Sequence, residues 1–323
     1  MNILLKFSKY SDSFRSFTHV LGFISKEAAV PPPGLIPVSA IHLPTHVKNR
    51  IVRIVFQTKK HLLLVLVAGL LTGCLLNMVT GRNQLSLVNE SELQLMAVSQ
   101  YRTFLAENKV LSSGTREAAL VDRVGARISN AITRYYNEQG KGAVLEGYNW
   151  EFNTVDSKEA NAWCMPGGKV VVYAGLLPIT QTETGLAIVV GHEIAHAIAK
   201  HGSERMSQAM MQQMGGTALQ IAISQKPQET QNLFLQSYAI GSQLGAVLPW
   251  SRQQETEADQ YGLIFAAMAG YNPQEAIPFW ERMSKAGGAS PPEFLSTHPS
   301  DATRIRKLKQ FMPEAMKYYN QTK

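Results

Sequence analysis

The spacing of apolar residues predicts two helices between residues 90 and 136. The first covers "ESELQLMAVSQYRTFLAEN", with an apolar side made of Leu93, Leu95, Met96 and Val98. The second covers "GTREAALVDRVGARISNAITRYY", where apolar residues recur three and four positions apart and so share one helix face. These residues are Leu120, Val121, Val124, Ile128, Ala131, Ile132 and Tyr135.

The apolar period then changes from that of a helix to that of a strand. "YNWEFNTV" alternates, and a second strand, Lys169 to Ala174, follows the turn formed by Pro166, Gly167 and Gly168. From Thr180 onward nearly every segment has a helical period. The sequence therefore predicts an α+β fold, a small β-sheet beside a mostly helical body.

The positive net charge of +7 belongs to the leading part of the chain. Residues 1–73 contain nine Lys/Arg and two Asp/Glu, whereas residues 74–323 contain 22 of each. The part that folds thus has no net positive field to attract phosphate. We expect no nucleic-acid partner.

Residues 59–73 have the order of parts typical of a bacterial lipoprotein signal peptide. A positive start (Lys59, Lys60) precedes an apolar core, and small residues precede Cys74, the expected lipidation site. The alternative is an ordinary membrane anchor, because 62–80 is almost long enough to span a bilayer. Residues 1–58 are interpreted as a disordered extension or a mis-assigned start.

This interpretation predicts a lipidated tether over 74–94 and a catalytic domain over 95–323. The protein would be anchored by lipid in the envelope of a Gram-negative bacterium, facing the periplasm. Leu75 after the cysteine favours the outer membrane.

The stretch "VVGHEIAHAIAKHG" contains the clearest chemistry. His192 and His196 are four residues apart and so lie on one helix face, as two ligands of a tetrahedral zinc ion require. Glu193 lies beside the open position, where it could take a proton from water. His201, about 140° further round a continuous helix, is expected at the surface.

A third ligand is expected from "SRQQETEADQYG". Glu255 and Asp259 share a helix face that continues through small residues, so this helix could lie directly against the first one. Glu257 points elsewhere. Glu255 is the expected ligand, and a solvated acidic patch is the alternative. The small residues of the two faces are Ala258, Gly262 and Ala266, opposite Ala195 and Ala199.

"HEIAH" followed by "ETEAD" resembles the zinc metallopeptidases of family M48, which include HtpX and the CAAX prenyl proteases. "NAWCMPGGKVVVYAGLL" and "STHPSDATRI" extend the resemblance over roughly residues 95–310, closest to the LoiP and BepA lipoprotein branch. The resemblance implies a gluzincin-type zincin domain with one zinc per chain on His192, His196 and Glu255, and Glu193 as the catalytic glutamate. It implies that Asp259 is a proton donor, although orienting a zinc histidine is an alternative role.

The expected reaction is hydrolysis of internal peptide bonds in misfolded or membrane-associated envelope proteins, as in protein quality control. An extended substrate could pair with the strand Lys169 to Ala174. The expected substrate-binding residues are Asn161, Ala162, Val171 and Val172. An ordinary buried strand is the alternative.

Three further features of the sequence bear on the site. The resemblance places His298 near the active site, where it could stabilise an oxyanion or occupy the fourth zinc position; a helix-entry residue is the alternative. Met206, Met210 and Met214 could belong to a lid within 203–250, or simply pack. Cys164 is expected to be a buried free thiol.

The rival function is a zinc-bearing, chaperone-like lipoprotein that binds or assembles outer-membrane proteins without cleaving them. A structural zinc normally has four protein ligands, so an open position beside Glu193 favours catalysis. Unfolded or misassembled proteins are the expected partners in either case, and oligomerisation is left open.

Overall fold

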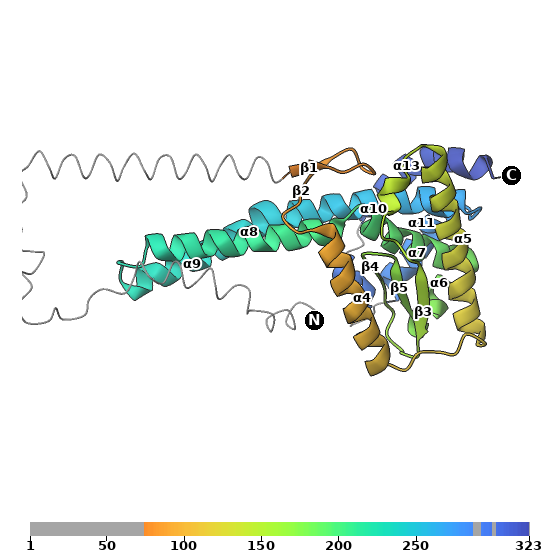
Figure 1. The fold of residues 1–323 in the computed structure, drawn as a ribbon, viewed down its shortest axis with the longest axis horizontal. Coiled ribbons are helices and arrows are strands. Elements are labelled where there is room, and N and C mark those ends of the chain that lie inside the picture. Colours follow the sequence, from red (N-terminus) through yellow and green to blue (C-terminus); the bar gives the residue numbers. More distant parts are fainter. Residues whose placement is uncertain (1–73, 287–291, 299–301, 323) are drawn as a thin grey trace, which may run out of the picture. The chain divides into compact units, whose positions relative to one another are not determined.

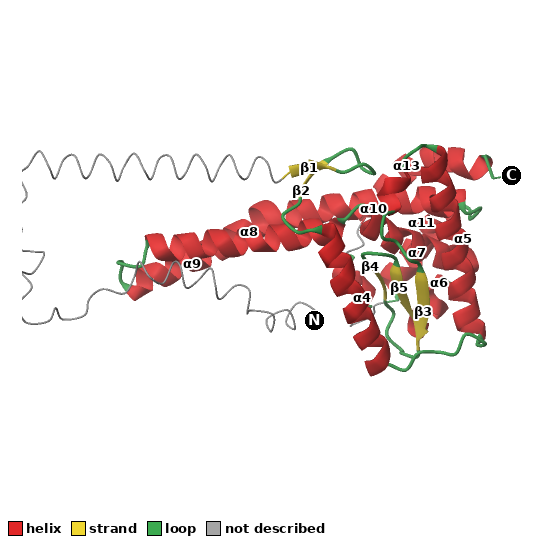
Figure 2. Cartoon of the chain, in the orientation of Figure 1, coloured by secondary structure: helices red, strands yellow, loops and turns green. Residues whose placement is uncertain are grey.

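The structure is a computed structural model that describes residues 74–286, 292–298 and 302–322. The predicted signal peptide and the extension before it, residues 1–73, lie outside the described residues. The strands are β1 (Cys74–Leu76), β2 (Asn83–Leu85), β3 (Glu151–Val155), β4 (Ala162–Met165) and β5 (Lys169–Tyr173). As expected, the fold is α+β, a small sheet beside a mostly helical body (Figure 2).

Helices make up most of the described chain (Figure 1). The α-helices are α4 (Glu90–Glu107), α5 (Arg116–Glu138), α6 (Leu177–Thr180), α7 (Glu183–Ile198), α8 (His201–Ala222), α9 (Gln228–Ser242), α10 (Leu248–Met268), α11 (Ala276–Lys285), α12 (Glu293–Thr297) and α13 (Ala302–Asn320). Short helical turns are η3 (Gly142–Leu145), η4 (Ala174–Leu176), η5 (Gln243–Val247) and η6 (Pro273–Glu275).

The main sheet has the order β3-β5-β4, with β5 parallel to β3 and antiparallel to β4. The β4–β5 turn contains Gly167 and Gly168, both at φ +82°, a conformation that only glycine adopts without strain. Because β5 is paired on both sides, it has no free edge. The prediction that a substrate pairs with this strand is therefore wrong, and the edge strands of the sheet are β3 and β4.

Alternate residues of β5 face two different layers. Val170 and Val172 join the core shared with α5 and α7, whereas Val171 packs with Tyr101 of α4 on the opposite face. All three valines are fully buried, as expected for a central strand covered on both faces.

Helix α5 matches its prediction, but α4 does so only in part. On α5, Val121, Val124 and Ile128 are fully buried. On α4 the buried residues are Leu93, Ala97 and Tyr101, spaced by four, while Leu95 and Met96 are exposed. Their position on the helix turns them away from the sheet that α4 covers.

Helix α7 lies at the centre of the domain, and its residues Gly185–Ile198 are all buried. It crosses α10 at a glycine pair: a Cβ on Gly262 would lie 2.8 Å from His192 Cα, and one on Gly191 would lie 2.7 Å from Gly262 O. The two small faces therefore meet as predicted, with Ala195, Ala258 and Ala266 buried between them. This close approach positions the side chains of α10 beside the histidines of α7.

The segment 74–94, expected to be a tether, is instead part of the folded domain. Strands β1 and β2 form an antiparallel hairpin, and α4 begins at Glu90 with an Asn89 cap. Cys74, the predicted lipidation site, is exposed in β1 and pairs with Leu85.

Helices α8 and α9 pack against each other and extend away from the sheet (Figure 1). Met206 and Met210 are partly buried and Met214 is 53% exposed. Among the described residues, no helix is both long and apolar enough to cross a bilayer.

Candidate metal centre

The two histidines of the HExxH motif point to the same place from α7. The helix is capped by Thr182, the residue before it, whose hydroxyl accepts a hydrogen bond from the Gly185 N–H. One helical turn separates His192 from His196, and their Nε2 atoms lie 3.1 Å apart. Each side chain is at most 5% exposed.

Glu255 reaches the histidines from α10. Its Oε2 lies 3.5 Å from His192 Nε2, and its Oε1 lies 3.3 Å from His196 Nε2. Burial opposes ionisation, but the three surrounding imidazoles outweigh it and hold the pKa of Glu255 far below its usual value. Glu255 is thus the expected third member of the group, and it is a carboxylate.

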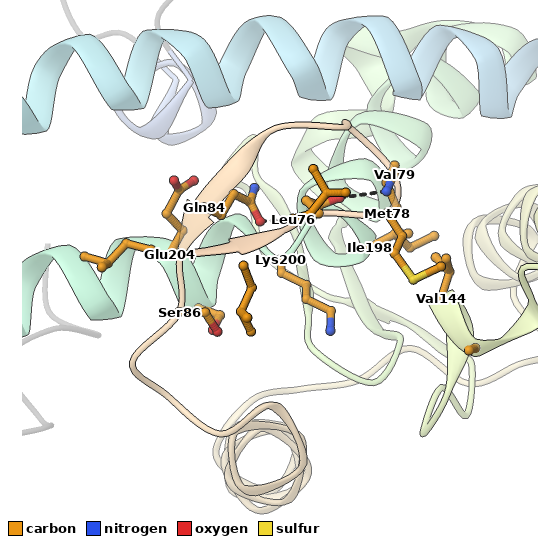
Figure 3. Close-up of a pocket in the computed structure, with 14 residues that line it drawn as sticks. Leu76, Met78, Val79, Gln84, Ser86, Val144, Ile198, Lys200 and Glu204 are labelled. Atoms are coloured by element: carbon orange, nitrogen blue, oxygen red, sulfur yellow. Dashed lines mark hydrogen bonds between the residues drawn. The ribbon is translucent and has the colours of Figure 1, made fainter. Parts of the chain in front are cut away.

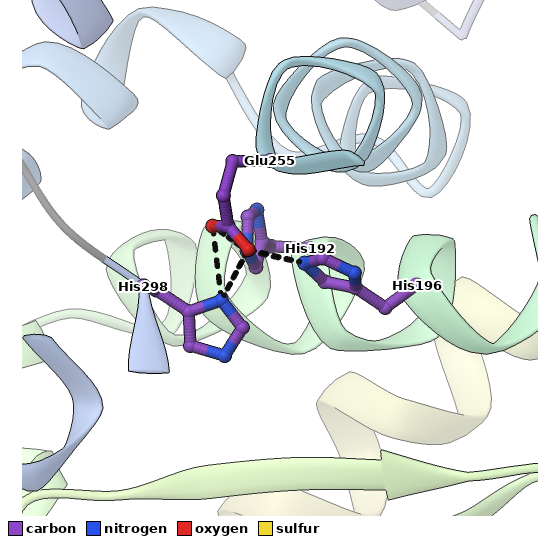
Figure 4. A group of neighbouring side chains, drawn as sticks. All are labelled: His192, His196, Glu255 and His298. Carbon is purple, nitrogen blue, oxygen red and sulfur yellow. Dashed lines mark hydrogen bonds and ion pairs between the residues drawn. The ribbon is translucent and has the colours of Figure 1, made fainter. Parts of the chain in front are cut away.

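His298 closes the group from the fourth side (Figure 4). It follows α12, and its Nδ1 lies 3.0 Å from Glu255 Oε2 and 3.2 Å from His192 Nε2. Its other ring nitrogen, Nε2, lies 3.3 Å from Glu193 Oε1. His298 thus touches both the ligand group and the predicted catalytic glutamate.

The arrangement of these four side chains is better explained by coordination of a zinc ion than by hydrogen bonds among themselves. Neighbouring corners of a tetrahedron with bonds of about 2.0–2.2 Å lie about 3.3–3.6 Å apart. Five of the six pairs are separated by 3.0–3.5 Å, close to that spacing, and all the ligand atoms lie within 4.8 Å of one another. Two imidazole nitrogens facing each other can share only one proton, so a cation satisfies this cluster more completely. Imidazole and carboxylate are ligands that zinc accepts.

Asp259 supports His192 rather than facing the substrate side. Its Oδ1 lies 3.0 Å from His192 Nδ1, and Arg304 donates to both of its oxygens at 2.6 and 2.8 Å. The Arg304 guanidinium also lies 3.4 Å from the centre of the Trp280 ring. Burial opposes ionisation of Asp259, but Arg304 and His192 outweigh it and lower its pKa. This geometry is the one expected of a carboxylate that orients the imidazole, the alternative role considered above.

His201 lies inside the site, contrary to the prediction that it is a surface residue. It is fully buried, and its Nδ1 lies 2.9 Å from His196 Nδ1. The prediction assumed one continuous helix, but α7 ends at Ile198 and Lys200 has a left-handed backbone with φ +56°. This break turns the chain so that His201 faces back toward His196.

Glu257 and Arg304 are the other site residues that sequence reasoning missed. Glu257 accepts a hydrogen bond from His201 Nε2 at 3.0 Å, although it lies on a different side of α10 from Glu255. A signal did exist for His201, since it is one of only four histidines in residues 74–323. Glu257 and Arg304 lie within the quoted motifs "ETEAD" and "STHPSDATRI", but the motifs alone did not indicate which residues they contact.

The expected substrate residues lie in two strands. Val171 and Val172 are in the central strand β5, whereas Ala162 begins the edge strand β4 and Asn161 precedes it. Cys164 is a free, partly buried thiol in β4. Burial raises its pKa well above the usual value, which disfavours the reactive thiolate.

Two histidines on one helix, a glutamate from a later helix and a glutamate beside the first histidine define a metallopeptidase of the gluzincin kind. A family comparison agrees: the model of peptidase family M48 matches residues 122–312. The chain belongs to peptidase family M48.

Several curated relatives are mitochondrial. The chain is similar to mitochondrial metalloendopeptidase OMA1 of Saccharomyces cerevisiae (35% identical over 196 residues, 58% of this chain and 54% of that protein). It is also similar to human OMA1 (30% over 249 residues, 74% and 46%). The Escherichia coli β-barrel assembly-enhancing protease is more distant (28% over 187 residues, 54% and 37%). The chain thus spans about half the length of its mitochondrial relatives.

These relatives overturn the predicted location in a Gram-negative envelope. The more similar proteins are mitochondrial enzymes from fungi, a plant and animals, whereas the bacterial ones are 27–28% identical. The location prediction is wrong because it rested on a short motif around Cys74, and such a motif also arises where an apolar stretch ends in small residues. The prediction that Cys74 is lipidated assumed a bacterial envelope, so it no longer has support.

Proposed function

We propose that this protein is a zinc-dependent endopeptidase that hydrolyses internal peptide bonds of misfolded or membrane-associated proteins. One observation carries the proposal: His192, His196 and Glu255 converge from two helices, and Glu193 is buried beside them. A zinc ion held there would polarise a peptide carbonyl and lower the pKa of a water molecule.

Glu193 is the proposed general base. It is 4% exposed, and its Oε1 makes no well-formed hydrogen bond with the described residues, although His298 Nε2 lies 3.3 Å from it. A buried acceptor without a donor is costly to the fold, so this oxygen is suited to receive a proton from water during the reaction. Glu193 would then return the proton to the leaving amine, because Asp259 is engaged by Arg304 and His192.

The free edge of β4 is the proposed binding place for an extended substrate. Tyr173 N donates to Asn161 O, so in this antiparallel pair the backbone groups of Ala162 and Cys164 face away from β5. β4 also packs against α7, which contains the histidines. Pairing through the main chain would give loose side-chain specificity, as suits a protease of misfolded proteins.

His298 is proposed to hold the enzyme in a latent state. It supplies the fourth ligand position and approaches Glu193, so a substrate carbonyl and water could enter only after it moves. Displacing one ligand from a group held by three others is a local change and does not require the domain to unfold.

The mitochondrion is the proposed compartment. The OMA1 proteins to which the chain is similar are named as mitochondrial metalloendopeptidases. Residues 1–58 contain seven Lys/Arg and two Asp/Glu, and mitochondrial transit peptides are likewise basic and poor in acidic residues.

The decisive experiment measures cleavage of casein by the zinc-loaded full chain and by its Glu193→Gln variant. We expect cleavage by the unaltered chain and a loss of at least about a hundredfold in the variant, because the general base is gone. Zinc content should remain one per chain in both, since Glu193 is not a ligand. Cleavage that survives the substitution would contradict the assigned role of Glu193.

A second candidate is a zinc-bearing chaperone that binds clients without cleaving them. The observation that favours it is the closed group of four ligands, which is typical of structural zinc. Client binding with no cleavage, by either the unaltered chain or a His298→Ala variant, would favour this candidate over the peptidase.

A further inference from the structure

An ionic cluster joins the N-terminal hairpin to two helices of the metal centre. Arg82, just before β2, contacts both oxygens of Glu204 on α8, Nη1 at 2.6 Å and Nη2 at 2.7 Å. Its Nε lies 2.7 Å from Glu257 Oε1 on α10. The side chains are 19%, 3% and 12% exposed, so this is a mostly buried cluster and not a surface ion pair.

The cluster continues to a metal ligand through His201. Glu257 Oε2 lies 3.0 Å from His201 Nε2, and His201 Nδ1 lies 2.9 Å from His196 Nδ1. Glu257 Oε1 also accepts a hydrogen bond from Arg82 Nε, so both oxygens of this carboxylate are acceptors in the cluster.

Only one assignment of protons satisfies the whole series and leaves His196 able to bind a metal. His201 Nε2 must donate to the carboxylate, so the neutral ring has its lone pair on Nδ1. That lone pair accepts the proton of His196 Nδ1. His196 Nε2 then keeps its lone pair, directed toward Glu255.

The hairpin is also fixed to the end of the metal-binding helix. Asn77 Nδ2 and Gln84 Nε2 each donate to Ala199 O at 2.9 Å, one residue beyond α7. Figure 3 shows the hairpin, with Gln84 on it, beside Lys200 and Glu204 at the junction of α7 and α8. These bonds satisfy a carbonyl that the end of a helix leaves unpaired.

We infer that Arg82 and His201 are positioning residues, which hold His196 in the orientation and tautomer that bind the metal. The route runs from Arg82 to Glu257, from Glu257 to His201 and from His201 to His196. The inference rests on the proposed metal site. It also means that a segment outside the family match of residues 122–312 completes the metal centre.

The test measures the zinc dissociation constant of the full chain by competition with a chromophoric chelator. We expect Arg82→Met to raise it about tenfold and His201→Gln by about 10–100-fold, the usual effect of losing a group that orients a metal ligand. The Arg82→Met/His201→Gln double variant should lose no more than His201→Gln alone, because Arg82 acts through His201.

Arg123→Met is the matched control. Arg123, like Arg82, pairs with a glutamate, and Nη2 lies 2.8 Å from Oε2 of Glu183. Glu183 is the first residue of α7, at the end of the helix away from His196. Its zinc dissociation constant should stay within about twofold of the unaltered chain, since Glu183 does not contact a ligand.

Melting of the metal-free variants separates positioning from a purely structural role. A structural role would lower the melting temperature without zinc and leave the zinc dissociation constant of the folded variants unchanged, which would overturn the inference. If the increase in the zinc dissociation constant of the double variant equals the product of the two single increases, Arg82 does not act through His201, and the proposed route is overturned. An unaltered chain that binds no zinc would overturn the proposed metal site as well, whereas zinc binding without casein cleavage would count only against the proposed peptidase.

Discussion

The two histidines of the HExxH motif each have a hydrogen-bond partner on the ring nitrogen that faces away from the metal site. His192 is oriented by Asp259, and Asp259 is held by Arg304. His196 is backed by His201, and His201 by Glu257. Each metal histidine therefore has its own supporting carboxylate, directly in one case and through a second imidazole in the other.

At the residue scale, His298→Ala should activate the enzyme. Removing the imidazole opens the fourth ligand position and frees Glu193 Oε1. If about one molecule in ten is open in the unaltered chain, kcat/KM for casein should rise about tenfold. Ser296→Ala, an exposed change two residues away on α12, serves as the control. A fall in kcat/KM with His298→Ala would show that His298 assists catalysis and does not inhibit it.

Between elements, the crossing of α7 and α10 matters most for the site. It is the contact that places Glu255 beside the histidines, and it depends on backbone approaching backbone at Gly191 and Gly262. Small residues on both helices make that approach possible.

At the element scale, Gly262→Ala should destabilise the domain and weaken zinc binding. The added Cβ would lie 2.8 Å from the His192 backbone, so the helices must separate, at a cost of about 1–3 kcal/mol. Thermal melting should show a decrease of about 2–12 °C. Gly202→Ala on α8 is the control: it meets no atom within 4 Å and should leave the melting temperature equal or slightly higher. Equal melting of both variants would contradict this account of the helix crossing.

Across the whole molecule, the metal site connects segments that are distant in sequence. The side chains that could hold the ion come from α7, from α10 and from the residue after α12, and the hairpin of residues 74–85 contacts α10 through Arg82. A bound ion would therefore stabilise the folded chain as a unit.

At the scale of the molecule, removing zinc should lower the melting temperature. Zinc at about a thousand times its dissociation constant contributes about 4 kcal/mol, which corresponds to about 8–16 °C for a domain of this size. Differential scanning calorimetry with and without a chelator measures the change. A His196→Ala variant should show little response to the chelator. Identical melting of the unaltered chain in both conditions would reject a stably bound metal.

Features with a fixed local period could be predicted from the sequence alone. Helix α5, the α7 histidine pair and the glycine turn between β4 and β5 follow from spacing and backbone freedom, so they need no knowledge of distant segments. The pairing of Glu255 with that histidine helix was also predictable, because both helices have small faces.

Tertiary structure decided the rest, because it depends on partners far apart in the chain. The apolar run of β5 left open whether an edge of this strand is free, and only its pairing with both β3 and β4 shows that it is the central strand. The position of His201 depends on one left-handed residue, Lys200, that ends a helix. Arg82 resembles any polar residue of a linker until the fold brings it to Glu204 and Glu257, more than a hundred residues away.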